Sequence, residues 1–247
     1  VASANVTICS GSSTPLSALA SGGNGNYTYL WSPVTIPSSG PNVTASPVSN
    51  TTYTVTVTDG CGSPAVTASV TVTIFAPAVV SFNADSLTGC APLCVQFTNT
   101  TAGVTSCNWD FGDNTTITGN CNPTHCYNTP GNFPVILNIT DANGCAASLT
   151  IPNYIAVYPN PTASFVFSPQ PATLMDPNIQ FTDQSTGATL WNWTFGDLQG
   201  SSSSQQNPSF TYQDSGYFDV TLTVTNAFGC SDDTTMTLEI KPDYTFY

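Results

Sequence analysis

Apolar and polar residues alternate strictly along many short stretches of this chain. The alternation is clearest at residues 53–58, 66–74, 220–225 and 236–240, where apolar residues, mostly Val, Leu or Ile, alternate with polar residues, mostly Thr. A period of two places the apolar side chains on one face of a strand and the hydroxyl groups on the other. Branched Thr and Val are also favoured on pleated strands. No segment has a sustained period of 3.6 with helix caps, so the pattern predicts an all-β protein.

Clusters of Gly, Pro and Asn interrupt these strands about every eight to twelve residues, which is the spacing of a β-sandwich. The apolar fraction of 40% is sufficient for a packed core. The sequence therefore predicts immunoglobulin-like β-sandwiches.

The middle of the chain repeats near its end. Trp109-Asp110-Phe111-Gly112-Asp113 matches Trp193-Thr194-Phe195-Gly196-Asp197, and Tyr127 matches Tyr212. The offset is 84 residues early in the match and 85 late, so two homologous units follow each other. The first third is a more distant relative, in which Tyr29 and Trp31 replace the Trp-x-Phe pair.

We therefore expect three tandem domains, which we call the first repeat (1–76), the second repeat (77–158) and the third repeat (159–247). The boundaries carry proline, at 76–78 and 158–161. Proline fixes φ and cannot continue a ladder, so the linkers should be stiff and the molecule an extended rod.

Charge removes several classes of function. The chain has a single Lys or Arg, Lys241, and a net charge of -13. Binding to nucleic acid requires several basic contacts that release counterions, so this class of partner is excluded. Anionic membrane surfaces are excluded for the same reason. No stretch has the roughly 18 consecutive apolar residues of a membrane span, so direct membrane insertion is not expected.

Catalytic machinery is not evident either. The only histidine is His125, and no serine elbow accompanies it. Paired carboxylates or a zinc ligand set are also lacking, so we expect no enzyme activity and no cofactor. Calcium is the one metal alternative, with hard oxygen ligands at turn aspartates, above all Asp113 and Asp197.

The residues of the two repeats resemble a known family. Trp-Asp-Phe-Gly-Asp and Trp-Thr-Phe-Gly-Asp, each followed by Asn-Pro-x-x-x-Tyr and Gly-x-Phe-x-Val-x-Leu, look like the signature of PKD domains. The first repeat resembles the shorter Ig-like domains found beside them. In such a sandwich Trp109, Phe111, Trp193 and Phe195 would be core residues. The Gly-Asp pairs would break the strand into a turn, and Tyr127 and Tyr212 would act as tyrosine corners.

The nine cysteines favour an oxidising compartment. By analogy between the repeats, we expect Cys9 to pair with Cys61, and Cys90 with Cys145. Cys94, Cys107, Cys121 and Cys126 leave three possible pairings, of which we favour Cys94–Cys126 and Cys107–Cys121. Leu174 stands where the third repeat would carry a counterpart of Cys90. Cys230 is therefore expected to be a free thiol or an intermolecular link.

The Gly-Cys-Ala-Pro-Leu and Asn-Gly-Cys segments are similar to PKD arrays on surface proteins of Bacteroidetes, including type 9-secreted proteins. This resemblance implies O-glycosylation at Ser86 and Thr234, within Asp-Ser-Leu and Asp-Thr-Thr motifs.

Three functions remain. The first is a non-catalytic stalk or adhesive module on a bacterial cell surface. The second is a self-associating subunit of an extracellular filament, because exposed edge strands accept a partner strand. The third is the accessory region of a secreted protease or polysaccharide-degrading enzyme. The expected partners are other extracellular proteins or glycans.

Overall fold

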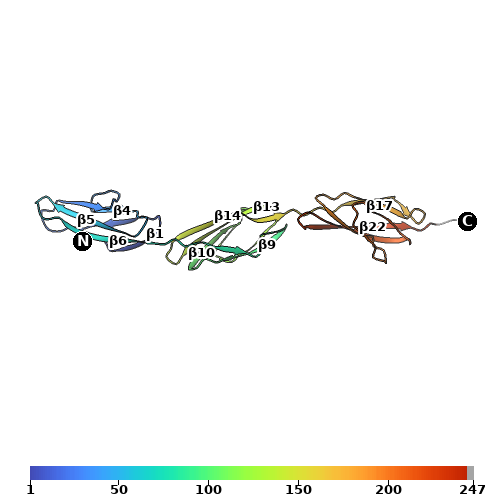
Figure 1. Ribbon diagram of the computed structural model, residues 1–247, viewed down its shortest axis with the longest axis horizontal. Coiled ribbons are helices and arrows are strands. Elements are labelled where there is room, and N and C mark those ends of the chain that lie inside the picture. Colours follow the sequence, from blue (N-terminus) through green and yellow to red (C-terminus); the bar gives the residue numbers. More distant parts are fainter. Residues whose placement is uncertain (244–247) are drawn as a thin grey trace. The chain divides into compact units, whose positions relative to one another are not determined.

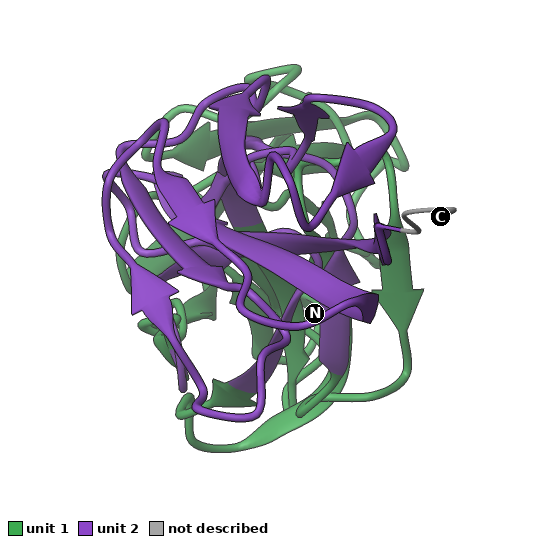
Figure 2. Ribbon diagram, turned by 90° about the vertical axis from the view of Figure 1, so that its right-hand side faces the viewer, with its two compact units in different colours: residues 1–83, 98–123, 136–150 green, residues 84–97, 124–135, 151–247 purple. Residues whose placement is uncertain are grey.

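The computed structural model describes residues 1–243, and every regular element within them is a β-strand (Figure 1). The fold is a tandem of immunoglobulin-like β-sandwiches. No helix in this part of the chain could cross a membrane. The described chain divides into two compact units (Figure 2). Unit 1 comprises residues 1–83, 98–123 and 136–150, and unit 2 comprises residues 84–97, 124–135 and 151–247.

The first repeat lies within unit 1 and forms two sheets. One sheet has the order β1-β6-β5-β3, and the other pairs β2 with β4. Strand β1 runs parallel to β6, whereas the other pairs are antiparallel. The strands are β1 (Val6–Cys9), β2 (Thr14–Ser17), β3 (Tyr27–Ser32), β4 (Asn42–Ala45), β5 (Thr51–Asp59) and β6 (Val66–Phe75).

The alternating pattern of β5 explains the two faces of this sheet. Tyr53 and Val55 are buried in a core that also contains Trp31. On the opposite face, the hydroxyl of Thr52 lies 3.0 Å from that of Thr71 on β6, and a second hydroxyl pair follows one step along the strands. The threonine face is thus satisfied by cross-strand hydrogen bonds rather than by charge.

The remainder of unit 1 holds the Trp-x-Phe strand of the second repeat. This strand, β10 (Val104–Asp110), pairs antiparallel with β11 (Thr116–Thr118) and with residues 136–141 of β13 (Gly131–Asp141). Trp109 is fully buried, and its ring meets that of Phe82 edge-on at 5.0 Å between centroids. Phe82 begins β7 (Phe82–Ala84).

Unit 2 contains the remaining residues of the second repeat, at 84–97, 124–135 and 151–158. Strand β8 (Thr88–Cys90) runs parallel to the end of β14 (Ala146–Tyr158), and β9 (Leu93–Asn99) pairs antiparallel with β12 (Thr124–Tyr127).

The third repeat lies entirely in unit 2 and again has two sheets. Their orders are β15-β17-β20 and β16-β22-β21-β18-β19. The strands are β15 (Phe165–Ser168), β16 (Ala172–Thr173), β17 (Asn178–Asp183), β18 (Leu190–Thr194), β19 (Ser202–Ser203), β20 (Ser209–Thr211), β21 (Gly216–Thr225) and β22 (Ser231–Lys241).

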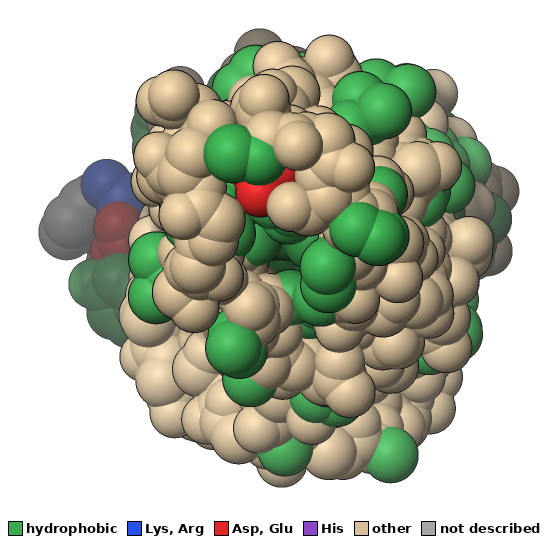
Figure 3. Space-filling model, turned by 90° about the vertical axis from the view of Figure 1, so that its left-hand side faces the viewer, with side chains coloured by type: hydrophobic (Ala, Val, Ile, Leu, Met, Phe, Trp, Pro, Cys, Tyr) green, Lys and Arg blue, Asp and Glu red, His purple; other side chains and the backbone are tan. Residues whose placement is uncertain are grey.

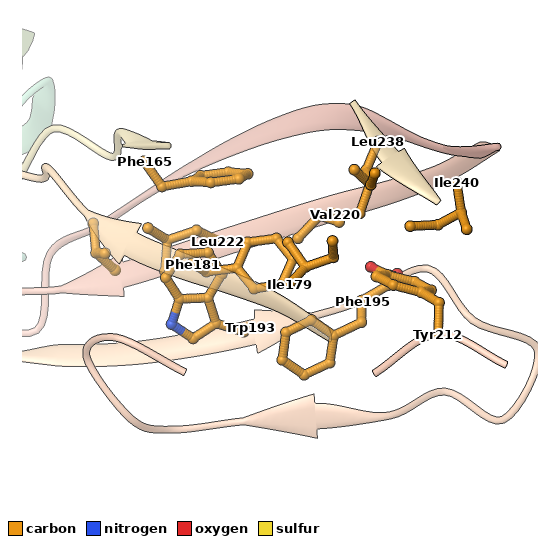
Figure 4. Packing of buried hydrophobic residues seen from close by; sticks show 12 residues of the cluster. Phe165, Ile179, Phe181, Trp193, Phe195, Tyr212, Val220, Leu222, Leu238 and Ile240 are labelled. Carbon is orange, nitrogen blue, oxygen red and sulfur yellow. The ribbon is translucent and has the colours of Figure 1, made fainter. Parts of the chain in front are cut away.

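The core of the third repeat is aromatic at its centre. Trp193 packs against both Phe165 and Phe181, at centroid distances of 5.0 and 5.5 Å (Figure 4). Aliphatic residues of β21 and β22, such as Leu222, complete the cluster. Each large ring removes roughly 150–250 Å² from water, so this cluster supplies much of the driving force for folding.

Candidate functional site

The Trp-x-Phe-Gly-Asp motif of the third repeat has a structural position. Strand β18 ends at Thr194, and Phe195 is buried directly after it. Gly196 then adopts φ +71°, in the left-handed region that favours glycine. A Cβ on Gly196 would lie 2.6 Å from the carbonyl oxygen of Asp219, so two backbone segments approach closely here.

Asp197 closes the turn that follows. Its carboxylate accepts hydrogen bonds from the amide of Ser201 at 2.8 Å and from the hydroxyl of Ser201 at 2.6 Å. Tyr212 reaches the same place from another segment, and its buried hydroxyl donates to the carbonyl of Phe195 at 2.8 Å. These groups hold the end of β18 in place, which is a structural role rather than a catalytic one.

The second repeat also places its motif in the core and in a turn. Trp109, Phe111 and Tyr127 are fully buried. Asp110 accepts a hydrogen bond from the amide of Gly112 at 2.9 Å, and Asp113 accepts one from the amide of Thr115 at 3.1 Å.

The aspartates singled out for calcium are therefore occupied by local hydrogen bonds. Within residues 1–243, no group of three or more His, Cys, Asp or Glu side chains is arranged to hold a metal ion. The proposed glycosylation residues, Ser86 and Thr234, are both half-buried. The Ser86 hydroxyl donates to the carbonyl of Thr88 at 3.1 Å. Modification at these positions stays a prediction.

Two disulfides lie within the second repeat. Cys94 is joined to Cys126, and Cys107 to Cys121, which are the two pairs that we favoured among the three possibilities. Cys94 and Cys126 are opposite each other on β9 and β12, so strand register brings their sulfur atoms together.

The expected pairing of the other cysteines is wrong. Cys9 is joined to Cys145 rather than to Cys61, and Cys90 is joined to Cys230 rather than to Cys145. The Cα atoms are 5.5 and 5.6 Å apart, within the range that a disulfide requires. Cys230 is thus neither free nor available for an intermolecular link, and the free thiol is the exposed Cys61. Each of these disulfides joins one repeat to the next.

Both linking disulfides begin at the same place in the fold. Cys9 lies opposite Phe75 in the parallel β1–β6 pair, and Cys90 lies opposite Tyr158 in the parallel β8–β14 pair. Phe75 and Tyr158 are the last residues of their strands. In the first and second repeats, the cysteine that bonds to the next repeat therefore lies beside the last strand residue before the linker. Each pair of consecutive repeats is thus joined by two covalent connections, the peptide chain and a disulfide.

Further contacts accompany the second of these junctions. Tyr158 stacks on Phe228 of the third repeat, with centroids 4.2 Å apart and planes 8° from parallel. The side chain of Asn226 donates to the carbonyl of Pro159 at 2.7 Å, and that of Asn160 donates to the carbonyl of Ala91 at 2.7 Å. We take this junction, with its disulfide, as the candidate functional site.

This junction does not follow from pairing cysteines within repeats. A usable signal was present, since the third repeat has a loop cysteine, Cys230, without a strand cysteine of its own. Strand register also shows that Leu174 is not the residue of the third repeat that corresponds to Cys90. Thr173, rather than Leu174, lies opposite Lys241, the last residue of β22.

Comparison with known proteins identifies the second and third repeats. The family model described as "PKD domain" matches residues 76–157 and 159–241. The chain belongs to the PKD domain family. PKD and immunoglobulin-like sandwiches are typical of non-catalytic extracellular modules, and disulfides suit the same oxidising compartment.

Several solved structures are similar to parts or all of this PKD-domain chain. The PKD1 domain of the Vibrio cholerae metalloprotease PrtV is 26% identical, with a TM-score of 0.29, and the match covers 33% of this chain and 96% of that one. The three amino-terminal domains of the bacteriophage RB49 outer capsid protein Hoc are 14% identical, with a TM-score of 0.40 and 95% coverage of both chains. Titin domains I67–I69 are 11% identical, with a TM-score of 0.43, and the match covers 98% of this chain and 96% of that one.

Proposed function

We propose that this chain is a spacer of an extracellular surface protein that resists mechanical force, in which disulfides between consecutive repeats limit how far the chain extends. The observation that carries the proposal is the pair of inter-repeat bonds, Cys9–Cys145 and Cys90–Cys230. They close loops with sequence separations of 136 and 140 residues, and these loops overlap.

The overlap creates a short covalent route along the molecule. A force applied at residues 1 and 247 passes from Cys9 to Cys145, back along the chain to Cys126, across to Cys94, and from Cys90 to Cys230. The peptide segments on this route are 1–9, 126–145, 90–94 and 230–247. They total about 50 residues, which span about 180 Å when fully extended. Without disulfides the whole chain would span about 850 Å.

Such connectivity suits a stalk better than a binding module. If the sandwiches unfold under load, most residues still lie in loops closed by disulfides. The force does not act on these loops, so they cannot be extended. A polar surface with one Lys or Arg gives little positive charge to attract anionic ligands nonspecifically. The exposed alternation of hydroxyl residues is consistent with a solvated spacer.

Single-molecule pulling of the full chain by its two ends tests this function. With oxidised disulfides, we expect the total extension to stop at about 180 Å. Addition of a reducing thiol should release extension toward about 850 Å. An oxidised chain that lengthens well beyond the first value would show that the bonds do not carry the load, and would overturn the proposal.

We also propose where this surface protein is found and what it contacts. The resemblance to surface proteins of Bacteroidetes supports a bacterial cell surface and type 9 secretion. Adhesion to other extracellular proteins or glycans would then be a property of the complete surface protein.

A further inference from the structure

Three loops of the chain share one hydrogen-bond pattern. They follow β5, β13 and β21 and begin at Asp59, Asp141 and Asn226. In each, the side-chain oxygen of that residue accepts hydrogen bonds from the amides two and four positions further on. The three loops are therefore structurally equivalent, and their residues correspond one to one over these five positions.

In the second and third repeats this loop receives the preceding repeat. The fourth position after the first loop residue is Cys145 or Cys230, each buried and bonded to a cysteine of the repeat before it. In the third repeat, the second position is Phe228, which stacks on Tyr158 of the preceding repeat.

In the first repeat the same loop has no such neighbour within the described residues. Its fourth position is Ser63, whose hydroxyl donates to Asp59 at 2.9 Å, and this bond lowers the pKa of Asp59. Its second position is Cys61, the free and exposed thiol. Cys61 therefore occupies the position that in the third repeat touches the preceding repeat.

The chain enters the first and third repeats in the same way. Thr162 and Thr186 exchange two backbone hydrogen bonds, and Val1 and Leu19 exchange the corresponding pair. Val1 thus corresponds to Thr162. The linker residue just before Thr162 is Pro161, which is buried at this end of the third repeat.

At the corresponding end of the first repeat there is an open apolar groove of about 380 Å³. Figure 3 faces this end and shows hydrophobic side chains gathered around a hollow with an acidic group beside it. Val1, Leu19 and Val66 are mostly exposed there. The lining residues include Val1, Leu19, Tyr27, Val57, Asp59 and Val66.

We propose that this end of the first repeat receives a further sandwich repeat, attached to Val1 through a three-residue linker, and that Cys61 forms a disulfide with a cysteine of that repeat. The linker length follows from the two internal junctions. In the second, residues 159–161 separate Tyr158 from Thr162. In the first, residues 76–78 separate Phe75 from Val79, because Ser81 and Ser164 accept corresponding backbone hydrogen bonds. The proposal rests on this geometry and does not depend on the spacer function.

A second copy of the chain fits the groove less well than a preceding repeat. All cysteines except Cys61 are already bonded within the chain, so a second copy could offer only its own Cys61. Forming the proposed bond joins two Sγ atoms and releases two protons and two electrons. A disulfide of the thiol oxidoreductase or glutathione class accepts them and is reduced to two thiols.

Peptide mapping of the native protein tests the covalent part. The protein is isolated from its source cells with thiols blocked by an alkylating reagent, and is digested with pepsin in acid without reduction. We expect the Cys61 peptide to be joined to a peptide whose sequence lies outside residues 1–247. An alkylated Cys61, a small thiol on Cys61, or a bond between two Cys61 residues would overturn the proposal.

A recombinant tandem protein tests the docking geometry separately. Residues 1–241 are joined through Pro-Asn-Pro to Val1 of a complete second copy, with Cys61→Ser in both copies. The upstream copy carries Thr173→Cys and the downstream copy Ser63→Cys, which places the thiols at the positions of Cys90 and Cys230. We expect these two thiols to form a disulfide while all native disulfides stay intact.

The matched control moves the downstream thiol to the opposite end of β5, with Ser49→Cys in place of Ser63→Cys. Ser49 is also exposed. This control should retain both thiols. If the Ser63→Cys tandem retains both thiols too, or if the control links equally well, the groove does not receive a preceding repeat.

Discussion

The hydroxyl of Tyr212 donates a 2.8 Å hydrogen bond to the backbone carbonyl of Phe195. The bond is buried, and it joins the segment before β21 to the end of β18, where the chain must turn sharply at Gly196. This hydrogen bond therefore holds together two segments of one sandwich. Its value can be measured by removing one atom.

Tyr212→Phe keeps the ring and removes the hydroxyl, so the carbonyl of Phe195 would lose this partner in the core. We expect a loss of about 1–3 kcal/mol in the free energy of unfolding. Tyr217→Phe is the control, because the Tyr217 hydroxyl bonds to Glu239 on the exposed face, and should cost less than about 0.5 kcal/mol. Urea unfolding measures both. Equal losses would contradict a special role for Tyr212.

Alkaline pH should weaken the hydrogen bond between Tyr212 and Phe195. Burial, assisted by the negative charge of Asp197, raises the pKa of Tyr212 above its ordinary value. A raised folded-state pKa means that the stabilisation is complete below the unfolded pKa of about 10 and is lost as the pH rises through the folded value. Unfolding free energies between about pH 9 and about pH 11 should fall less steeply for Tyr212→Phe. Cys61 must be alkylated first to prevent disulfide exchange. Parallel curves would refute this assignment.

Gly196→Ala should be among the most damaging small substitutions. The new methyl group would lie 2.6 Å from the carbonyl oxygen and 2.7 Å from the amide nitrogen of Asp219, and φ is +71°. We expect a loss of more than about 3 kcal/mol, because neither backbone segment can move freely. Gly200→Ala is matched, since φ is +67° there but no atom lies within 4 Å. It should cost about 1 kcal/mol. Thermal unfolding compares the two.

The stacked rings at the second junction should be energetically coupled. A double-mutant cycle with Tyr158→Ala and Phe228→Ala is expected to give a coupling energy of about 0.5–1.5 kcal/mol. The same cycle between Tyr158 and the distant Phe167 should give none. If the first cycle also gives zero, the stacking contributes nothing and the disulfide alone holds the junction.

Removal of an inner disulfide should lengthen the chain under load in a way that depends on its place in the covalent route. Cys94→Ser with Cys126→Ser forces the route through residues 90–107, across the Cys107–Cys121 disulfide and through residues 121–145. The limiting extension should therefore rise from about 180 Å to about 245 Å. Cys107→Ser with Cys121→Ser removes a bond outside the route and should leave the limit unchanged. Pulling experiments on both variants decide whether the route is correct.

The sequence by itself was enough to predict the class of fold. Alternation in stretches such as 220–225 fixes which side chains face the core, because successive residues of a strand point to opposite faces. Val220, Leu222 and Val224 are indeed buried. The repeated Trp-x-Phe-Gly-Asp motif likewise predicts a buried strand that ends in a turn, since glycine adopts the left-handed conformation found at Gly196 without steric cost.

The pairs Cys9–Cys145 and Cys90–Cys230 were decided only by the tertiary structure. Analogy between repeats gives each cysteine a position within its own sandwich, but a disulfide forms only where two Cα atoms come within about 7 Å. That distance depends on the short linker and on the parallel register beside it, which bring the end of one sandwich to a loop of the next. Alternation along a strand carries no information about this contact between consecutive sandwiches. The sequence therefore determined the sandwich folds, and the tertiary structure determined which cysteines bond them together.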